Sequence, residues 1–446
     1  MKKLVLLSLV CSLLMAEKLS FSDAWFTMQS VNDGLKAEKE GEKHAKIMKE
    51  AASSMYLPSV NLTGSYTHID KPLEIERGEF TAGTGLPIPL PTQDLSFLKQ
   101  DIFLADLNIL WPLYTGGKIS IANDLRQTQV SEAKAKSNMA EDKAFVTLVK
   151  VYYGVLMGKA LLQTRQEVQK ALALHYDHAK KLKEQGQIAK VELLNAKVQY
   201  DKAKIETLKA KHSYEIAYSA LSKLLKSKDI KPTSQLFVNF EVDDEAHYDE
   251  AMQANNPGLK LLDIKQKQSG MLVDMEKGSY HPTLAAYGNY NLYKDDSLLL
   301  DALPKWFVGV GVKWTLFDSS GRSEKLEAAH VLQTQVKFVQ AQARTDLSIL
   351  LEKSYKEMQL YLDEYRALNS SLALAKENVR LRERSFTEGL STSIDVIDAQ
   401  LFLAGTKTER LNAAYNYVQK LSHVMVLSGE RDNFIVLEKN GKVVRR

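Results

Sequence analysis

The sequence contains little cysteine and proline, and no long apolar stretch interrupts it. Its one cysteine, Cys11, lies in an apolar run near the N-terminus, so neither disulfides nor thiol chemistry hold the rest of the chain together. Proline is absent between Pro112 and Pro232 and again after Pro304. Because proline disrupts helix interiors, these gaps predict long helices. No internal apolar run reaches the ~20 residues of a membrane helix, so a membrane crossing would require strands.

Charge and motif content argue against two classes of function. The chain has 59 Lys and Arg against 55 Asp and Glu, whereas a nucleic-acid surface would show a concentrated basic excess. There is no zinc-protease histidine spacing, phosphate loop or nucleophile elbow. His175 and His178 are placed to share a metal on a predicted helix, but a solvated pair is the favoured interpretation. We therefore expect neither an enzyme nor a cofactor or resident metal, and no nucleic-acid partner.

The N-terminal segment has the layout of an export signal. Lys2 and Lys3 precede an apolar run from Leu4 to Met15, and Ala16 ends the segment. This arrangement is typical of a secretory signal peptide. We expect cleavage after Ala16 and export of the remaining chain.

The chain repeats itself at roughly half its length. The matched segments, in order, are 32–36 with 256–260, 56–66 with 280–290, 111–118 with 314–322, and 186–196 with 389–399. Four matches in one order indicate an internal duplication, and the long period indicates two halves rather than a solenoid.

Each half predicts a polar helix, two strands and a long helical hairpin, so the fold class is mainly α with a small β part. The polar helices are expected at about 19–55 and 246–278. The predicted divisions are a signal peptide (1–16), a first repeat (17–228, strands 58–70 and 101–114, hairpin 117–227), a linker (229–245), a second repeat (246–428, strands 282–293 and 305–317, hairpin 321–428) and a C-terminal tail (429–446).

The predicted strands alternate apolar and polar residues, as strands with one apolar face do. A single such strand fits a soluble core better, but four of them with aromatic ends, after a signal peptide, favour a membrane barrel. Four strands cannot close a barrel, and an open edge in lipid leaves backbone groups unpaired. We therefore expect copies of the chain to pool their strands. The side chains expected to face lipid are Leu107, Ile109, Trp111, Val308, Val310, Val312 and Trp314.

The predicted hairpins are unusually long. At 1.5 Å per residue, each of the helices from Gly117 and Gly321 would run to roughly 100 Å. Each is expected to end at a glycine, Gly186 or Gly389, because glycine accepts the left-handed conformation at a helix end. Thr392 and Asp395 predict a capping box for the second return helix. Ala189 stands in the matching place of the first, where no such cap is expected.

The duplicated halves, the Trp-Pro-Leu-Tyr-Thr-Gly-Gly entry into the first long helix and the Glu-Gly-Leu-Ser-Thr-Ser-Ile-Asp-Val-Ile-Asp-Ala turn resemble the TolC family of outer-membrane efflux proteins. The resemblance extends over nearly the whole mature sequence. It implies a homotrimer with a shared twelve-stranded barrel in the lipid of the outer membrane and a helical tunnel in the periplasm of a Gram-negative bacterium. It also implies passive exit of substrates, in multidrug or metal efflux or in type I secretion. An inner-membrane pump of RND, ABC or MFS type would drive this exit through a periplasmic adaptor protein.

The resemblance also implies roles for residues at the hairpin tips. Asp395 and Asp398 match the family's aspartate ring at the tunnel entrance. The family's best-known gate uses a tyrosine and an arginine that bond a threonine–aspartate pair. Here those positions hold Phe386, Ser391, Val191 and Glu192, so we expect Phe386 packing and carboxylate repulsion to set the closed state. The residues expected to meet the adaptor are Gly186, Gln187, Gly389, Leu390 and Ser391.

Two further expectations concern the strand connections and the class of protein. The segment from Lys71 to Lys99 is much longer than its counterpart, Lys294 to Lys305, and we expect it at the cell surface, with Thr84 accessible. A disordered insert is the alternative there. An exported coiled-coil protein without channel activity is the alternative function, although it does not explain the strand pairs.

Overall fold

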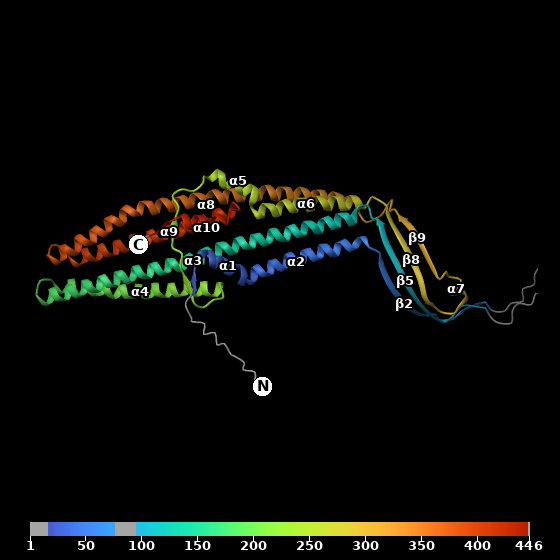
Figure 1. The fold of residues 1–446 in the computed structure, drawn as a ribbon, viewed down its shortest axis with the longest axis horizontal. Helices are drawn as coiled ribbons and strands as arrows, with labels where there is room; N and C mark the ends of the chain where they lie inside the picture. Colours follow the sequence, from blue (N-terminus) through green and yellow to red (C-terminus); the bar gives the residue numbers. More distant parts are fainter. Residues whose placement is uncertain (1–16, 76–94, 445–446) are drawn as a thin grey trace, which may run out of the picture. The chain divides into compact units, whose positions relative to one another are not determined.

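The computed structural model describes residues 17–75 and 95–444 (Figure 1). The predicted signal peptide and Thr84 lie outside the described residues. Contacts divide the chain into two units. Unit 1 contains residues up to Glu42, Glu132–Asp263 and Phe338 onward, and unit 2 contains Lys43–Ser131 and Ile264–Lys337.

The two halves of the chain have the same order of elements. The first half has α1 (Phe21–Val31), α2 (Asp33–Ser53), β2 (Ser59–His68), β5 (Asp101–Tyr114), α3 (Lys118–Glu184) and α4 (Lys190–Leu224), with a small hairpin of β3 (Leu73–Ile75) and β4 (Leu95–Leu98) between β2 and β5. The second has α5 (Glu245–Asn255), α6 (Pro257–Gly278), β8 (Thr283–Lys294), α7 (Leu298–Asp301), β9 (Trp306–Lys313), α8 (Arg322–Thr387) and α9 (Ser393–Leu427). The predicted fold class, mainly α with internal duplication, is confirmed.

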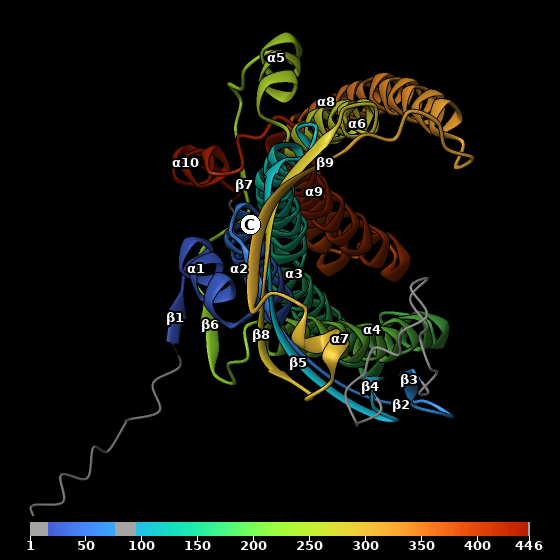
Figure 2. The same cartoon turned by 90° about the vertical axis from the view of Figure 1, so that its right-hand side faces the viewer.

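The larger antiparallel sheet of unit 2 has the strand order β2-β5-β8-β9, and Figure 2 shows that its strands curve. Directly paired residues share a face of a sheet. One row across the sheet is Leu62, Leu107, Tyr290 and Trp306, and the next is Val60, Ile109, Gly288 and Val308. On the other face the Asn289 amide donates to Asn108 at 2.9 Å. One face of the sheet is therefore apolar, and the other carries hydrogen-bonded polar side chains together with Leu110, Tyr287 and Phe307.

The duplication extends to individual hydrogen bonds in unit 2. The Trp111 indole donates to the Tyr56 carbonyl at 2.9 Å, and the Trp314 indole donates to the Tyr280 carbonyl at 3.1 Å. Each bond joins a tryptophan near or just beyond the end of a strand to the segment that links the preceding helix to the strand pair. The same local pairs thus recur in both halves.

The elements of the structure differ from the expected ones in three places. The helices expected at about 19–55 and 246–278 are each broken, at Asn32 and Asn256, whose side chains accept the N–H of Leu35 and Leu259 and so begin a second helix. The strand expected over 305–317 ends at Lys313. The segment 229–245 carries two short strands, β6 (Ile230–Pro232) and β7 (Phe237–Val238).

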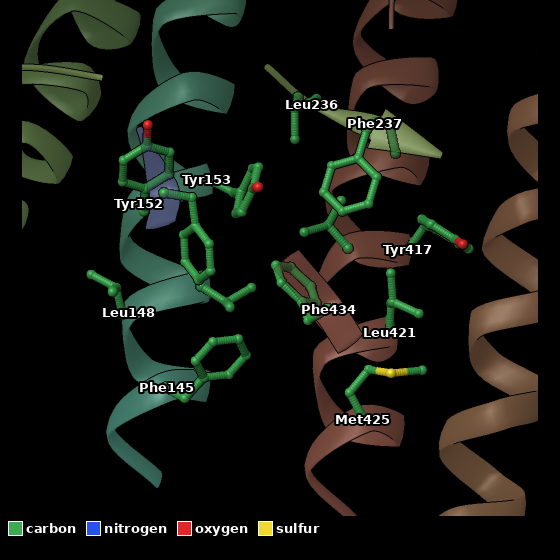
Figure 3. Packing of buried hydrophobic residues seen from close by; sticks show 14 of the residues in the cluster. Phe145, Leu148, Tyr152, Tyr153, Leu236, Phe237, Tyr417, Leu421, Met425 and Phe434 are labelled. Atoms are coloured by element: carbon green, nitrogen blue, oxygen red, sulfur yellow. The ribbon is translucent and has the colours of Figure 1, made fainter. Parts of the chain in front are cut away.

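The core of unit 1 is built around aromatic side chains (Figure 3). Phe145 and Tyr153 on α3, Phe237 on β7 and Phe434 on α10 (Asn433–Asn440) are all essentially inaccessible. Phe434 lies 5.4 Å from Phe145 and 5.8 Å from Phe237, in edge-on contact. Such contacts contribute about 0.5–1.5 kcal/mol each beyond area burial. The C-terminal helix is therefore part of the core.

Both ends of the described chain pair with the segment that joins the two halves. β1 (Glu17–Leu19) pairs in parallel with β6, and β10 (Lys442–Val443) pairs antiparallel with β7. The Tyr152 hydroxyl on α3 donates to the Leu19 carbonyl at 2.7 Å, which fixes β1 on the core. By length and composition alone, α3 could cross a membrane, and 44% of its apolar stretch is buried within the described chain.

Candidate entrance at the hairpin tips

Both hairpin turns end their long helix in the same way. Gly186 and Gly389 have φ of 75° and 74°. The N–H of Gln187 bonds the Leu182 carbonyl at 2.8 Å, and the N–H of Leu390 bonds the Ser385 carbonyl at 2.8 Å. This is the Schellman arrangement, which uses left-handed glycine to satisfy the last helical carbonyls. The exposed residues at the two turns include Gly186, Gln187, Gly389 and Leu390.

The helix starts after the two turns differ, as expected. The Thr392 hydroxyl accepts the Asp395 N–H and the Asp395 carboxylate accepts the Thr392 N–H at 2.9 Å, so α9 begins with a capping box. Ala189 caps α4 without a side-chain bond. Hydrogen bonds from Thr392 and Ser391 lower the pKa of the Asp395 carboxyl below its usual value. Asp395 thus serves its own helix, while Asp398, also on α9, is exposed.

The two hairpins meet at the start of α9. The backbone N–H of Ser393 donates to the Glu192 carboxylate on α4 at 3.0 Å. The Ser393 hydroxyl lies 2.5 Å from Nε2 of His175 on α3. One residue of the second hairpin is therefore bonded to both helices of the first.

An apolar cluster lies beside these bonds. Phe386 on α8 and Val396 on α9 pack with Ala179 on α3 and Ala196 on α4. The Phe386 ring is 4 % exposed and lies 4.7 Å from the His175 ring, centroid to centroid. Farther along the hairpins, the Lys407 ammonium on α9 donates to the Glu167 carboxylate on α3 at 2.6 Å. Polar bonds and apolar packing together join the hairpins.

The structure brings some of the predicted gate residues together and separates others. Phe386 and Glu192 lie in the contact between hairpins, Ser391 bonds Asp395, and Val191 is exposed. Sequence reasoning missed Ser393 because serine at a helix start usually signals only a local cap.

The interpretation of His175 and His178 as a solvated pair was wrong for His175. Its ring is 6 % exposed, because the second hairpin covers it. Burial and the neighbouring His178 lower the pKa of His175 to about 4. Among the described residues no group of three or more potential His, Cys, Asp or Glu ligands gathers to hold a metal.

The predicted lipid-facing residues lie in the sheet, apart from one. Val308, Val310 and Val312 on β9 are 76 %, 62 % and 69 % exposed, and Ile109 and Trp111 on β5 are also exposed. Leu107 is partly covered on the same face. Trp314 lies just beyond the end of β9, where its indole makes the bond to Tyr280.

A model of the outer membrane efflux protein family matches residues 35–226 and 249–430, once in each half. The chain belongs to the outer membrane efflux protein family. This is a transport family of the outer membrane and not an enzyme family, and membership places the chain in that membrane.

Known outer-membrane proteins are similar to this chain in sequence or in fold. The Escherichia coli (strain K12) outer membrane protein TolC is 23% identical over 298 residues, covering 60% of this chain and 57% of that protein. The chain thus matches somewhat more than half the length of this relative. The Campylobacter jejuni CmeC outer membrane channel has a TM-score of 0.74 at 14% identity, covering 95% of this chain and 90% of that one. The Neisseria gonorrhoeae MtrE outer membrane channel has a TM-score of 0.73 at 15% identity, covering 92% and 89%.

Proposed function

We propose that this chain forms a homotrimeric channel-tunnel in the outer membrane, through which substrates leave passively. An inner-membrane pump supplies the energy and reaches the channel through a periplasmic adaptor protein. The channel itself catalyses no reaction and needs no cofactor. Family membership and the similarity of fold to CmeC and MtrE support this proposal.

The observation that carries the proposal is the two-faced sheet. Its apolar rows, with Val308, Val310 and Val312 at one edge, suit contact with lipid. Its other face has the Asn108–Asn289 bond and suits a wet lumen. Lipid-facing and lumen-facing residues alternate along strands of membrane barrels. An exported coiled-coil protein would have no use for such a sheet.

The same sheet supports a trimer. β2 and β9 are its two edges, and an edge in lipid needs a partner strand because no water is there to satisfy it. The edges of three copies, joined β9 to β2, close a barrel of twelve strands. Helix α4 supports this association through a stripe of exposed apolar side chains, Val191, Leu194, Val198, Ile205 and Leu208. We assign this α4 stripe to the contact with the neighbouring copy.

We assign the entrance of the channel to the hairpin tips. In a trimer, Asp395 and Asp398 contribute six carboxylates, and a ring of acid side chains favours cations in a pore. Asp398 is exposed and Asp395 is partly exposed, which leaves both able to act on passing ions. Gly186, Gln187, Gly389, Leu390 and Ser391 lie at the turns and form the proposed docking surface for the adaptor.

Membrane fractionation and conductance test the proposal. We expect a heat-modifiable trimer in the outer-membrane fraction and cation-selective channels in planar bilayers. Asp395→Asn with Asp398→Asn should lower cation selectivity. The control is Asp363→Asn, a change at an exposed carboxylate on α8, the other helix of the same hairpin. A soluble periplasmic protein would contradict the channel, whereas unchanged selectivity would contradict only the aspartate entrance.

A further inference from the structure

His175 connects three helices from both hairpins through one buried side chain. Its ring on α3 bonds the Ser393 hydroxyl at the start of α9 and packs on the Phe386 ring of α8. Ser393 is fully buried and His175 is 6 % exposed. Separation of the hairpins would therefore break both contacts and expose the imidazole to water.

The surroundings of this imidazole suit only its neutral form. Ala179, Ala196 and Val396 form the apolar cluster beside it. Burying a charge in such a place is costly unless an opposite charge pairs with it.

The charged groups of the neighbouring helices are engaged elsewhere. The Glu192 carboxylate on α4 accepts the Ser393 N–H. On α8, Glu383 accepts from the Gln400 amide and Arg382 lies 3.7 Å from Asp395 on α9. His178, one turn along α3, adds repulsion. No carboxylate within the described part of the chain bonds the His175 ring.

We propose that His175 is a proton-operated latch, which holds the second hairpin on the first while neutral and releases it when protonated. Release would loosen the entrance, so the consequence for transport rests on the proposed function. The latch itself is a property of the hairpin contact and can be measured without transport.

The direction of the effect follows from linkage between protonation and conformation. Burial lowers the pKa of the latched ring to about 4, whereas a released ring regains the ordinary value of about 6.5. The latched state is therefore fully favoured above about pH 6.5, and it loses stability as pH falls toward about 4. Between these values the ratio of released to latched chains should rise about tenfold for each pH unit.

A cysteine reporter can measure this release directly. The only native cysteine is Cys11, in the predicted signal peptide, so an introduced thiol in the exported chain would be unique. Ala179→Cys places it in the cluster, where Ala179 is fully buried. The control is Lys180→Cys, at the next, exposed position. With a disulfide reagent that stays reactive in acid, we expect labelling at Ala179→Cys, divided by that of the control, to rise steeply below about pH 6.

Two variants separate the latch from general acid loosening. His175→Gln retains a hydrogen-bonding group but cannot take up a proton, so the pH step should vanish, with circular dichroism reporting whether the helices remain. His178→Gln should keep the onset of the step but reduce its extent at the acid end, because losing one source of repulsion raises the pKa of the latched ring toward that of the released ring. Ser393→Ala should raise labelling at neutral pH. A step of equal size in His175→Gln would overturn the proposal.

Conductance distinguishes the latch from the channel proposal. If the latch and the channel proposals both hold, bilayer conductance should rise over the same pH interval as labelling. His175→Gln should then abolish the pH-dependent rise in conductance and the pH-dependent rise in labelling. Labelling that changes with pH while no conductance is measured at any pH would support the latch and contradict the channel. Conductance without any pH-dependent labelling would support the channel and contradict the latch.

Discussion

The two return helices, α4 and α9, start from the same position in a duplicated chain and end in different environments. Each is 35 residues long and follows a left-handed glycine turn. Leu208 and Leu411 lie at the same distance from their turn glycines, yet Leu208 is 54 % exposed and Leu411 is 6 % exposed. Tyr417 is fully buried, whereas its counterpart Tyr214 is only partly covered. Duplication preserved the local structure but not the tertiary role.

The difference indicates how a duplicated chain can build both a core and an interface. α9 packs along much of its length against the first hairpin, β7 and α10, and its Tyr417 hydroxyl accepts the Asn239 N–H at 3.2 Å. α4 buries small residues such as Ala196 and Ala203 and leaves the α4 stripe exposed. In the proposed trimer, the copy that lies next to α4 would cover that stripe. The same helical pattern then serves folding in one half and assembly in the other.

The largest expected effect is the loss of unfolding free energy when the buried side chain of Tyr417 is removed. Tyr417→Ala should cost about 3–5 kcal/mol of unfolding free energy, because a large buried side chain is lost and a cavity remains. Tyr214→Ala, the matched change in α4, should cost about 1 kcal/mol. Urea unfolding in detergent, followed by circular dichroism, measures both. Equal losses would mean that α4 and α9 are equally important to the fold.

A charge on the α4 stripe should separate assembly from folding. Leu208→Asp should abolish the heat-modifiable trimer while the monomer keeps its helices, since Leu208 is exposed in the single chain. Leu411→Asp should instead reduce the yield of folded chain, because Leu411 lies in the core. Electrophoresis with and without heating, together with circular dichroism, reads out the two effects. A normal trimer in Leu208→Asp would remove α4 from the interface.

Substitutions at Gly389 test whether the turn needs glycine for its backbone conformation or for contact with the proposed adaptor. Gly389→Leu should abolish efflux with trimer yield unchanged; the left-handed conformation costs a non-glycine residue about 1–2 kcal/mol, too little to unfold the chain. A Cβ at Gly389 meets nothing within 4 Å, so internal crowding would not explain the loss. Gly389→Asn, which tolerates the left-handed conformation better, should retain efflux. Normal efflux in Gly389→Leu would leave the turn with a purely local role.

The smallest expected effects concern the N-terminal caps of α4 and α9. They test whether the side-chain cap makes the start of α9 more stable than that of α4. Thr392→Ala should cost about 1 kcal/mol, because the Asp395 N–H loses its acceptor. Ala189→Ser should gain up to about 1 kcal/mol by supplying the side-chain cap that α4 lacks. Thermal unfolding of the two variants measures these changes. Stability unaffected by both substitutions would indicate that tertiary packing alone fixes the helix starts.

Many features of the fold could be predicted from the sequence because they depend on near neighbours. Alternating side chains predict the strands, glycine at a helix end predicts the turns, and Thr392 with Asp395 predicts the capping box; the structure has all three. The breaks at Asn32 and Asn256 were missed, although both asparagines stand in the repeated motif. An asparagine can cap a helix or sit within one, and the local pattern alone did not decide between them.

The sequence by itself determined the duplication, the two-faced strands and the long hairpins, because each depends on the pattern and spacing of residues along the chain. Only the tertiary structure decided which apolar stripe is buried, because a stripe facing a core and a stripe facing a partner have the same pattern. It also decided that His175 is buried and bonded to Ser393, as a contact between two hairpins leaves no trace in the sequence of either. Chain packing, not helix propensity, sets these environments, because burial depends on which other segments arrive at the same place.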